Sequence, residues 1–365
     1  MLSSEDRLGR GAPALIPRPD DATLVIAAPG TGAGYWAGGP SAVATEDGIY
    51  LAYRLRRPVG RGRGYANAIA FAPDGEHFET IATIAKDDLD TESLERPELV
   101  RLPNGRWRLY LSCATTGTKH WQVEATEAAH PAEFDAGKRV LVLPGDEKKG
   151  VKDPVILSYE GQWHLWATVH PLGDPDEADQ MTTEYATSAD GLAWAWQGTA
   201  LAGRPGAWDS RGARVTAVRF GPRGGVTAYY DGRATAAENY EERTGLAYGA
   251  NPASLHVVSA DAPAAAARYC GGGLRYLDIV DLADGGTRLY YELTQPDGSH
   301  ALVSELYSLL SLARAGLVHH LASPAPGSSL TEPRSSGLAR SSPGRGRPAG
   351  RRPCCRSGRE ARASR

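Results

Sequence analysis

The sequence predicts an all-β fold, a five-bladed β-propeller in which four-stranded antiparallel blades surround a central axis. Three observations predict it: one hairpin pattern occurs five times, its copies follow at nearly one period, and helical periodicity is weak throughout. The turn glycines of the copies are 57, 56, 64 and 61 residues apart, at Gly48, Gly105, Gly161, Gly225 and Gly286. About sixty residues hold the four strands of a blade with generous loops. A β-sandwich also has short strands and regular turns, but it does not require five copies of one hairpin.

Each copy consists of an apolar strand, a turn with glycine, and a second strand that ends in aromatic residues, which is typical of a β-hairpin. The clearest copy spans residues 151–170, where residues 155–157 form the apolar run and Asp153 stands at its start. The first strands of the copies are expected at 40–43, 97–102, 154–157, 215–218 and 277–280. Residues at the start of each first strand should face one shared axial cavity.

Further strands are expected between the hairpins. At Asp74-Gly75 and Asp190-Gly191, a tight turn is followed three residues later by an aromatic residue that anchors an outer strand. Residues 302–317 are the exception with a helical pattern, and we expect one short helix there.

Three segments are expected along the chain: an N-terminal arm at 1–30, the propeller at 31–312, and a basic low-complexity tail at 313–365 that is disordered. From residue 323 onward the tail carries ten arginines against two acidic residues, although the whole chain has a formal net charge of −3. The body is therefore acidic, which argues against nucleic acid as a partner of the folded part.

The sequence shows no membrane, targeting or cofactor signal. No apolar run approaches the roughly 18 residues that a membrane-spanning helix needs, so no membrane partner is expected. The first twenty residues lack the apolar core of a secretory signal, which favours a cytoplasmic protein. The four cysteines form neither a disulfide framework nor a zinc pattern, and no grouping of His, Cys and acids has metal-ligand spacing. We therefore expect no metal and no cofactor.

Charged residues of both signs flank the first strands and are expected to meet at the axis. The acids are Glu95, Glu98, Asp153, Asp209, Asp231 and Asp278. Charges clustered in a cleft either pair structurally or perform chemistry. The arginines are Arg211, Arg214, Arg233 and Arg243. Two roles are open for them: they clamp a phosphate or a sugar carboxylate through bidentate hydrogen bonds, or they neutralise the acids between blades.

These motifs resemble those of the five-bladed propeller glycosidases, namely glycoside hydrolase families 43, 32 and 130, over most of residues 35–310. In these families an Asp-Pro or Glu-Pro at the start of the first strand recurs from blade to blade. Val151-Lys-Asp-Pro resembles the blade with the auxiliary Asp of family 43, which orients the catalytic acid and tunes its pKa. Residues 95–100 resemble motifs of families 43 and 130, and residues 208–215 with 229–234 resemble an aromatic-rich stretch of family 130.

The chain departs from the family pattern at the start of several first strands. Gly39 stands where families 43 and 32 have a catalytic Asp, and Arg96 stands where family 130 has its acid. Ala213 and Arg214 replace the Glu-Gly of family 43. The blade that starts at Asp153 keeps the expected carboxylate.

The resemblance implies a carbohydrate-active enzyme, a glycoside hydrolase that cleaves a small glycoside or oligosaccharide at the axis by general acid and base catalysis. We predict Asp153 and Glu98 as the catalytic pair, with Asp278 in reserve, because glycoside hydrolysis needs two carboxyl groups. The substrate-binding candidates are Trp36, Arg96, His120, His170, Asp209, Arg214, Asp231 and Arg233. Two alternatives stay open: a glycoside phosphorylase of similar fold whose arginines hold phosphate, and a sugar-binding propeller without its catalytic residues. The oligomeric state is left open.

Overall fold

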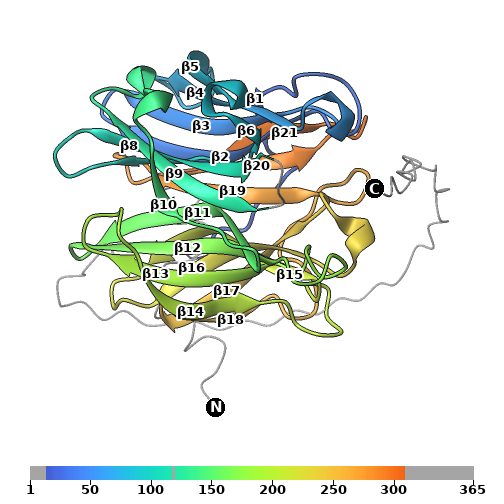
Figure 1. The fold of residues 1–365 in the computed structure, drawn as a ribbon. Coiled ribbons are helices and arrows are strands. Elements are labelled where there is room, and N and C mark those ends of the chain that lie inside the picture. The colour runs from blue at the N-terminus through green and yellow to red at the C-terminus, as the bar shows by residue number, and fades with distance from the viewer. Residues whose placement is uncertain (1–13, 117–119, 309–365) are drawn as a thin grey trace, which may run out of the picture.

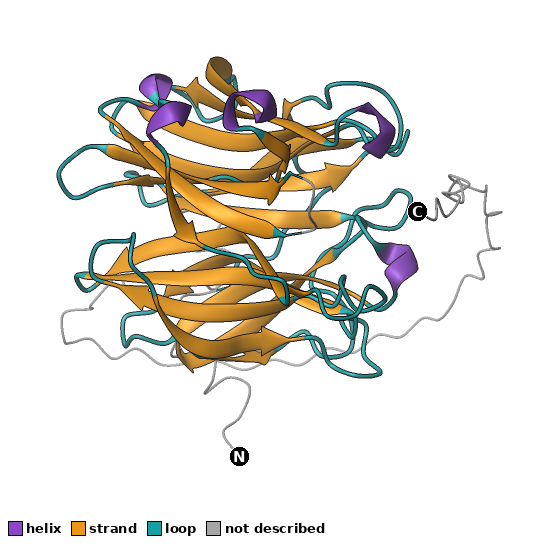
Figure 2. Cartoon of the chain, in the orientation of Figure 1, coloured by secondary structure: helices purple, strands orange, loops and turns teal. Residues whose placement is uncertain are grey.

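The computed structural model describes residues 14–116 and 120–308, which form an all-β structure as predicted (Figure 1, Figure 2). The helices of this part are short 3-10 turns in the connections between strands, and none of them has the length to cross a lipid bilayer. They are η1 (Val59–Arg61), η2 (Lys86–Leu89), η3 (Pro131–Glu133), η4 (Ala136–Lys138) and η5 (Ala236–Glu238). The predicted tail at 313–365 and the first 13 residues of the predicted arm lie outside the described residues.

The strands form four-stranded antiparallel units that follow one another along the chain. One contains β2 (Trp36–Thr45), β3 (Gly48–Arg56), β4 (Gly64–Ala72) and β5 (Glu79–Ala85). In the next, β6 (Thr91–Leu94) and β7 (Glu98–Arg101) both pair with β8 (Trp107–Thr115), followed by β9 (Trp121–Ala128) and β10 (Val140–Leu143). Then come β11 (Lys149–Tyr159), β12 (Gln162–Pro171), β13 (Thr182–Ser188) and β14 (Ala195–Ala202). The following unit has β15 (Gly212–Phe220), β16 (Val226–Arg233), β17 (Arg243–Asn251) and β18 (Ser254–Val257).

The last unit joins the two ends of the described chain. Its strands are β19 (Leu274–Asp281), β20 (Thr287–Thr294), β21 (His300–Tyr307) and, from the N-terminal side, β1 (Thr23–Ile26). β1 pairs antiparallel with β21, and a parallel bridge between Trp36 and His300 connects β21 to β2. The unit therefore shares one eight-stranded sheet with β2–β5.

The predicted helix at 302–317 is wrong over residues 302–307, which belong to β21. β21 lies between β20 and β1, so both of its edges are paired and nearly all of its side chains are buried. Leu302, Val303, Leu306 and Tyr307 recur at intervals of three to four residues, which matches one face of a helix, and strand pairing overrides this local pattern. Residues 309–317 lie outside the described residues.

The predicted hairpins are confirmed, because β2–β3, β7–β8, β11–β12, β15–β16 and β19–β20 are all antiparallel pairs. Both predicted Asp-Gly turns need their glycine, since Gly75 and Gly191 have φ of 72° and 74°. The apolar core lies mainly between neighbouring units. Trp166 of β12, for example, shares one cluster with Val215 and Tyr230 of the next unit.

The first strands of the units contact one another in a ring: β2 with β7, β7 with β11, β11 with β15, β15 with β19, and β19 with β2. Bulges interrupt these strands close to the ring, for instance between Lys152 and Val155 and between Arg275 and Asp278. Asp153, in the first of these bulges, has a left-handed φ of 50°. A bulge re-aims a side chain out of the regular alternation. The ring thus gathers side chains from all units at one place.

Candidate functional site

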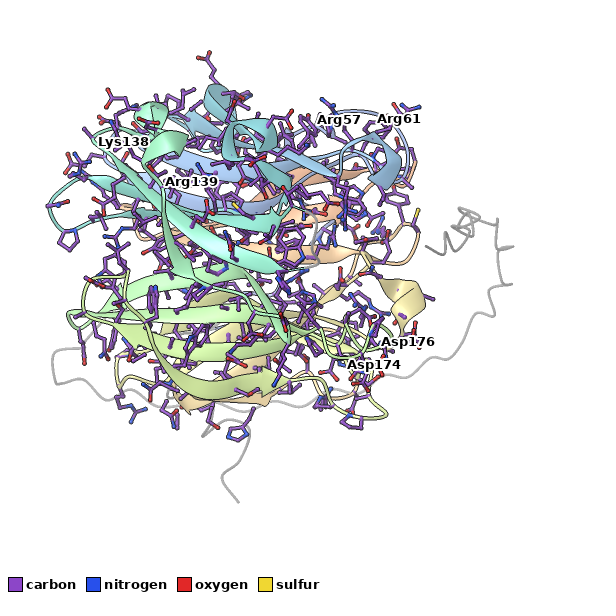
Figure 3. The ribbon with its side chains drawn as sticks, in the orientation of Figure 1. Arg57, Arg61, Lys138, Arg139, Asp174 and Asp176 are labelled. Carbon is purple, nitrogen blue, oxygen red and sulfur yellow. The ribbon has the colours of Figure 1, made fainter. Side chains whose placement is uncertain are left out.

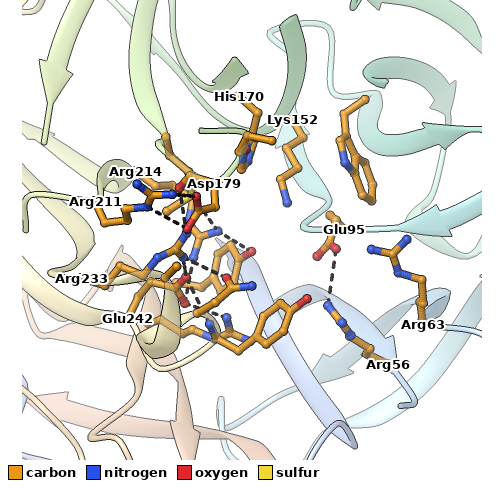
Figure 4. A pocket seen from close by; sticks show the side chains of 18 of the residues that line it. Arg56, Arg63, Glu95, Lys152, His170, Asp179, Arg211, Arg214, Arg233 and Glu242 are labelled. Carbon is orange, nitrogen blue, oxygen red and sulfur yellow. Dashed lines mark hydrogen bonds and ion pairs between the residues drawn. The ribbon is translucent and has the colours of Figure 1, made fainter. Parts of the chain in front are cut away.

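A cavity of about 460 Å³ lies where the first strands meet (Figure 4). Its lining draws on β3, β11, β12, β15, β16 and β19 and on segments between strands. Seven arginines and one lysine of the lining face four carboxylates. The carboxylates belong to Glu95, Asp176, Asp179 and Glu242. This composition favours a polar ligand with negative charge over an apolar one.

The strand period places the arginines of β3 in the cavity. Successive side chains of a strand point to opposite sides, so Arg54 and Arg56 point to the same side. Arg54 is paired across the hairpin with Gly38 of β2. A Cβ on Gly38 would lie 1.5 Å from the Oε2 atom of Glu292, so glycine is required to leave room for this carboxylate.

Buried ion pairs join most of these side chains into one network, which we call the axial network. Its cations are Arg54, Arg56, Lys152, Arg214, Arg233 and Arg275. Its carboxylates are Glu95, Asp153, Asp231, Glu242 and Glu292. All eleven side chains are buried. Buried charges are costly unless they are paired, so the pairing holds the lining in one arrangement.

Arg214 lies at the centre of the axial network. Its Nη2 atom is 2.7 Å from Oδ2 of Asp231, and its Nη1 atom is 3.3 Å from Oδ2 of Asp153. Nη1 also donates a 2.8 Å hydrogen bond to the hydroxyl of Tyr276. Burial raises the pKa of Asp231 to about 6, although Arg214 favours the charged carboxylate. Arg214 therefore holds together strands β11, β15, β16 and β19 through their side chains.

Glu242 and Glu292 are held ionised by arginines on either side. Arg275 lies 2.9 Å from Glu242 and 2.6 Å from Glu292, and Arg233 also pairs with Glu242. Burial opposes ionisation of Glu242, but Arg275, Arg233 and other cations outweigh it and hold the pKa well below the ordinary value. The same balance, set by Arg275 and Arg54, lowers the pKa of Glu292.

Glu95 and Glu242 are the two carboxylates of the axial network that line the cavity. Figure 4 shows Lys152, Arg63 and Arg56 around Glu95. It pairs with Arg54, and its Oε1 atom lies 3.8 Å from Nη1 of Arg56. Burial alone would raise its pKa, but the charges of Lys152, Arg54 and Arg56 outweigh burial and hold the pKa well below the ordinary value. Glu95 is therefore ionised at neutral pH, the protonation state that a base or a nucleophile needs, and the same cations weaken it as a proton acceptor.

Three of the predicted substrate-binding residues line the cavity: Arg214, Arg233 and His170. His170 is half-buried, and its Nδ1 atom lies 2.9 Å from the carbonyl oxygen of Ala178. Burial, assisted by the charge of Lys152, lowers the pKa of His170 to about 3. Its imidazole is consequently neutral at neutral pH and can offer a hydrogen bond without adding charge.

Three further predicted residues lie behind the lining. Asp153 and Asp231 are fully buried members of the axial network, and Asp153 accepts hydrogen bonds from the backbone of Arg96 and from Tyr276. Trp36 is buried under Arg56, whose guanidinium carbon lies 4.2 Å from the ring centre. These residues orient the lining and do not belong to it.

Glu98, Asp278 and Arg96 form a separate cluster outside the cavity lining. Nη2 of Arg96 lies 3.2 Å from Oε2 of Glu98, and its other nitrogens donate to the carbonyl oxygens of Pro40 and Thr216. Arg96 thus bridges the first strands of different units. Burial raises the pKa of Glu98 to about 7 in spite of Arg96, and the nearby Asp278 contributes to the rise. Burial also raises the pKa of the half-buried Asp278.

Replacing Glu98 by glutamine is expected to flatten the pH dependence of stability. The folded state binds the Glu98 proton more tightly than the unfolded state, because the pKa is raised from 4.5 to about 7. This contribution is complete below pH 4.5 and is lost as the pH rises through about 7, and it amounts to at most about 3 kcal/mol. Urea unfolding at pH 5 and pH 8 measures it, with Glu133→Gln on the exposed surface as the control. Equal losses of stability in wild type and Glu98→Gln would contradict the prediction.

The remaining two predicted residues lie away from the cavity lining. Asp209 is fully buried, accepts a 2.7 Å hydrogen bond from Tyr230 and pairs with Arg204 at 2.9 Å. Its contacts hold the loop before β15 and leave no carboxylate oxygen for a ligand. His120 is half-buried and its carbonyl oxygen accepts a hydrogen bond from the amide of Thr115.

Sequence reasoning missed several members of the lining, among them Arg54, Arg56, Tyr240 and Arg275 as binding residues. The signal that identifies the strand residues is a charged or polar side chain at every second position near the end of a buried second strand. β3 has Arg54 and Arg56 in this pattern, and β16 has Asp231 and Arg233. This signal lies in the second strands, whereas most of the predicted site residues lie near the starts of the first strands.

In the part of the chain that the structure describes, Cys113 and Cys270 are free thiols. In the described ranges, no three side chains of His, Cys, Asp or Glu are grouped to hold a metal ion. Cys113 is buried and burial raises the pKa of its thiol.

Comparison with known proteins identifies similar solved structures. No protein-family model and no curated protein matches the chain. Among solved structures, a thermostable family 43 glycoside hydrolase matches with 13% identity over 78% of this chain and 91% of its own, at a TM-score of 0.58. A family 43 enzyme from Xanthomonas citri, complexed with xylotriose, has 14% identity over 78% and 90%, with a TM-score of 0.55.

A third match comes from a study reporting that the family 130 mannoside phosphorylases contain glycoside hydrolases that target β-1,2-mannosidic linkages in Candida mannan. It has 15% identity over 83% of this chain and 94% of the other, with a TM-score of 0.55. At these identities the comparison establishes the fold. The predicted resemblance is confirmed at that level, and the chain has the propeller-like fold of glycoside hydrolase families 43 and 130.

Proposed function

We propose that this protein is a glycoside-cleaving enzyme built as a closed five-bladed propeller, with a small glycoside or oligosaccharide bound in the axial cavity. The ring of contacts from β2 through β7, β11, β15 and β19 back to β2 supports closure. The observation that carries the function is the position of the cavity: a polar pocket at the meeting point of the first strands, in a chain with the fold of glycoside hydrolases. Such a convergence of polar groups in one pocket marks the default binding site.

Glu95 acts as the base in this proposal. It is an ionised carboxylate of the lining, and Trp121 and Tyr240 supply flat aromatic faces in the same cavity. Asp153 positions Lys152 and Arg214 from behind, in agreement with the auxiliary role that the sequence resemblance implies. The catalytic roles predicted for Glu98 and Asp278 remain predictions, and both residues lie outside the lining.

A sugar-binding propeller without turnover is the second candidate, and one observation favours it. Arg96 fills the space beside Gly39, where related families have a catalytic Asp: a Cβ on Gly39 would lie 3.1 Å from Cβ of Arg96. The carboxyl groups with raised pKa values, Glu98, Asp231 and Asp278, are outside the lining. The described lining therefore contains no carboxyl group whose pKa is raised to make it a proton donor.

The experiment is a panel of 4-nitrophenyl glycosides of both anomers, assayed with and without inorganic phosphate. A nitrophenolate leaves without being protonated, so Glu95 suffices as the protein's catalytic group. We expect release of nitrophenolate from at least one member of the panel without phosphate. Release that depends on phosphate would identify a phosphorylase. Sugar binding measured by calorimetry, without release of nitrophenolate from any member of the panel, would identify the non-catalytic candidate and contradict the enzyme proposal.

A further inference from the structure

The axial network has one more positive charge than negative charge. Its six cations, five arginines and Lys152, are linked by ion pairs to only five carboxylates. At the edge of the network Asp179 lies between Arg233 and Arg211, which adds one charge of each sign, and His300 lies between Glu292 and Glu241. An uncompensated charge in a buried network is costly. The cavity therefore favours a ligand that brings one negative charge.

The excess charge is found at Arg56 and Lys152. Neither side chain makes a hydrogen bond to any of the described residues, although both are buried and both line the cavity. Nη1 of Arg56 lies 3.8 Å from Glu95, and Nζ of Lys152 lies 3.7 Å from Asp153, distances of ion pairs without a hydrogen bond. The other arginines of the network donate hydrogen bonds to its carboxylates.

Aromatic rings fix the directions of these two cations. The guanidinium carbon of Arg56 lies 4.2 Å from the ring centre of Trp36 and 4.7 Å from that of Tyr240. Nζ of Lys152 lies 4.8 Å from the ring centre of Trp121. Cation–π contacts of this kind stabilise a cation without using its hydrogen-bond donors. Those donors are left free for a ligand.

We propose that the cavity binds a sugar acid, a hexuronate or a glycoside of one, whose carboxylate is received by Arg56 and Lys152. The proposal rests on the glycoside-cleaving function proposed above and names its substrate class. A carboxylate supplies the one missing negative charge and matches the planar donor fork of arginine. Phosphate carries about −1.5 to −2 at neutral pH and would overcompensate the network. Trp121 and Tyr240 line the same cavity, and Lys152 and Arg56 each cover one side of their rings, so a sugar ring would pack beside these cations.

Calorimetry with D-glucuronate, D-galacturonate, neutral D-glucuronamide and inorganic phosphate tests the proposal on the full chain. We expect at least one hexuronate to bind ten-fold or more tightly than the amide. Lys152→Met should lose at least ten-fold in affinity for that hexuronate, and Lys152→Arg should keep most of it. Lys138→Met is the matched control, since Lys138 is exposed on the outside of the molecule, away from the cavity residue Asp176 (Figure 3).

The outcomes test the sugar-acid site and the cleavage proposal separately. Equal affinity for hexuronate and amide, tighter binding of phosphate than of either hexuronate, or an unchanged affinity in Lys152→Met would overturn the sugar-acid proposal. Hexuronate binding without release from any 4-nitrophenyl uronide would support the sugar-acid site and contradict the cleavage proposal. Cleavage of neutral glycosides that Lys152→Met leaves unchanged would support the cleavage proposal and contradict the sugar-acid site. Thermal unfolding monitored by circular dichroism shows that each variant is folded.

Discussion

Replacing Arg214 by methionine is expected to lower the free energy of unfolding by about 3–5 kcal/mol, the usual cost of removing one partner from a buried ion pair. Asp153 and Asp231 are both fully buried and both lose their arginine, and the hydroxyl of Tyr276 loses a donor. Methionine has a similar length and fills much of the space, so the loss reports mainly on the charges. Urea unfolding at neutral pH measures it.

The control for Arg214 is an ion pair on the surface. Arg268 pairs with Asp20, and both side chains are largely exposed, at 69% and 50%. Water and salt screen such a pair, so Arg268→Met should cost about 0–1 kcal/mol. Adding Asp231→Asn to Arg214→Met should recover part of the loss, because it removes one of the abandoned charges. A loss below about 1 kcal/mol for Arg214→Met would show that the network does not hold the first strands together.

The sequence predicts the strands well because their signals are local. Alternating side chains, a glycine turn and an aromatic strand end lie within about twenty residues of one another, and each predicted hairpin is a pair in the structure. The error over residues 302–307 has a tertiary cause. β1 comes from the N-terminal side and pairs with the outer edge of β21. No local pattern in the sequence of β21 indicates that partner.

The site is predicted less well because bulges and partners decide which side chain reaches the cavity. Asp153 was expected at the start of a strand, but it lies within β11 at a bulge, where its left-handed φ and its bonds to Arg214 and Tyr276 direct it into the network behind the lining. Arg96 was expected at the substrate and instead spans the axis between Pro40 and Thr216. Such contacts depend on residues more than fifty positions away in the sequence.

Residue types alone do not show which axial arginine has which role. The sequence already allows two roles for the axial arginines, neutralising acids and clamping an anion. The structure divides these roles among them: Arg214, Arg233 and Arg275 are hydrogen-bonded to carboxylates, whereas Arg56 is stacked on aromatic rings with its donors unused. Residue types alone do not make this distinction, because it depends on which arginines the folded chain pairs with carboxylates.

Replacing Glu95 by glutamine is expected to lower kcat for a 4-nitrophenyl glycoside by about 10²- to 10⁴-fold, the contribution of a general base. In the proposed step Glu95 takes a proton from water, the resulting hydroxide bonds to the anomeric carbon, and the bond to nitrophenolate breaks. Because Lys152, Arg54 and Arg56 hold the pKa of Glu95 below its ordinary value, wild-type kcat/KM should not fall between pH 8 and pH 5 through this group. Glu133→Gln, on the surface in η3, is the matched control.

External azide, tested on Glu95→Ala, separates loss of the base from loss of structure. Azide is a nucleophile that needs no deprotonation, and as a monoanion it suits the positive surroundings of Glu95, so it should restore nitrophenolate release in Glu95→Ala and yield a glycosyl azide. Proton NMR of the first product made by wild type gives the anomer. An inverted product agrees with Glu95 acting on water, whereas a retained product would make Glu95 a nucleophile that bonds to the sugar itself. Unchanged kcat in Glu95→Gln would place the base elsewhere in the cavity, with Asp179 and Glu242 as the next carboxylates to replace.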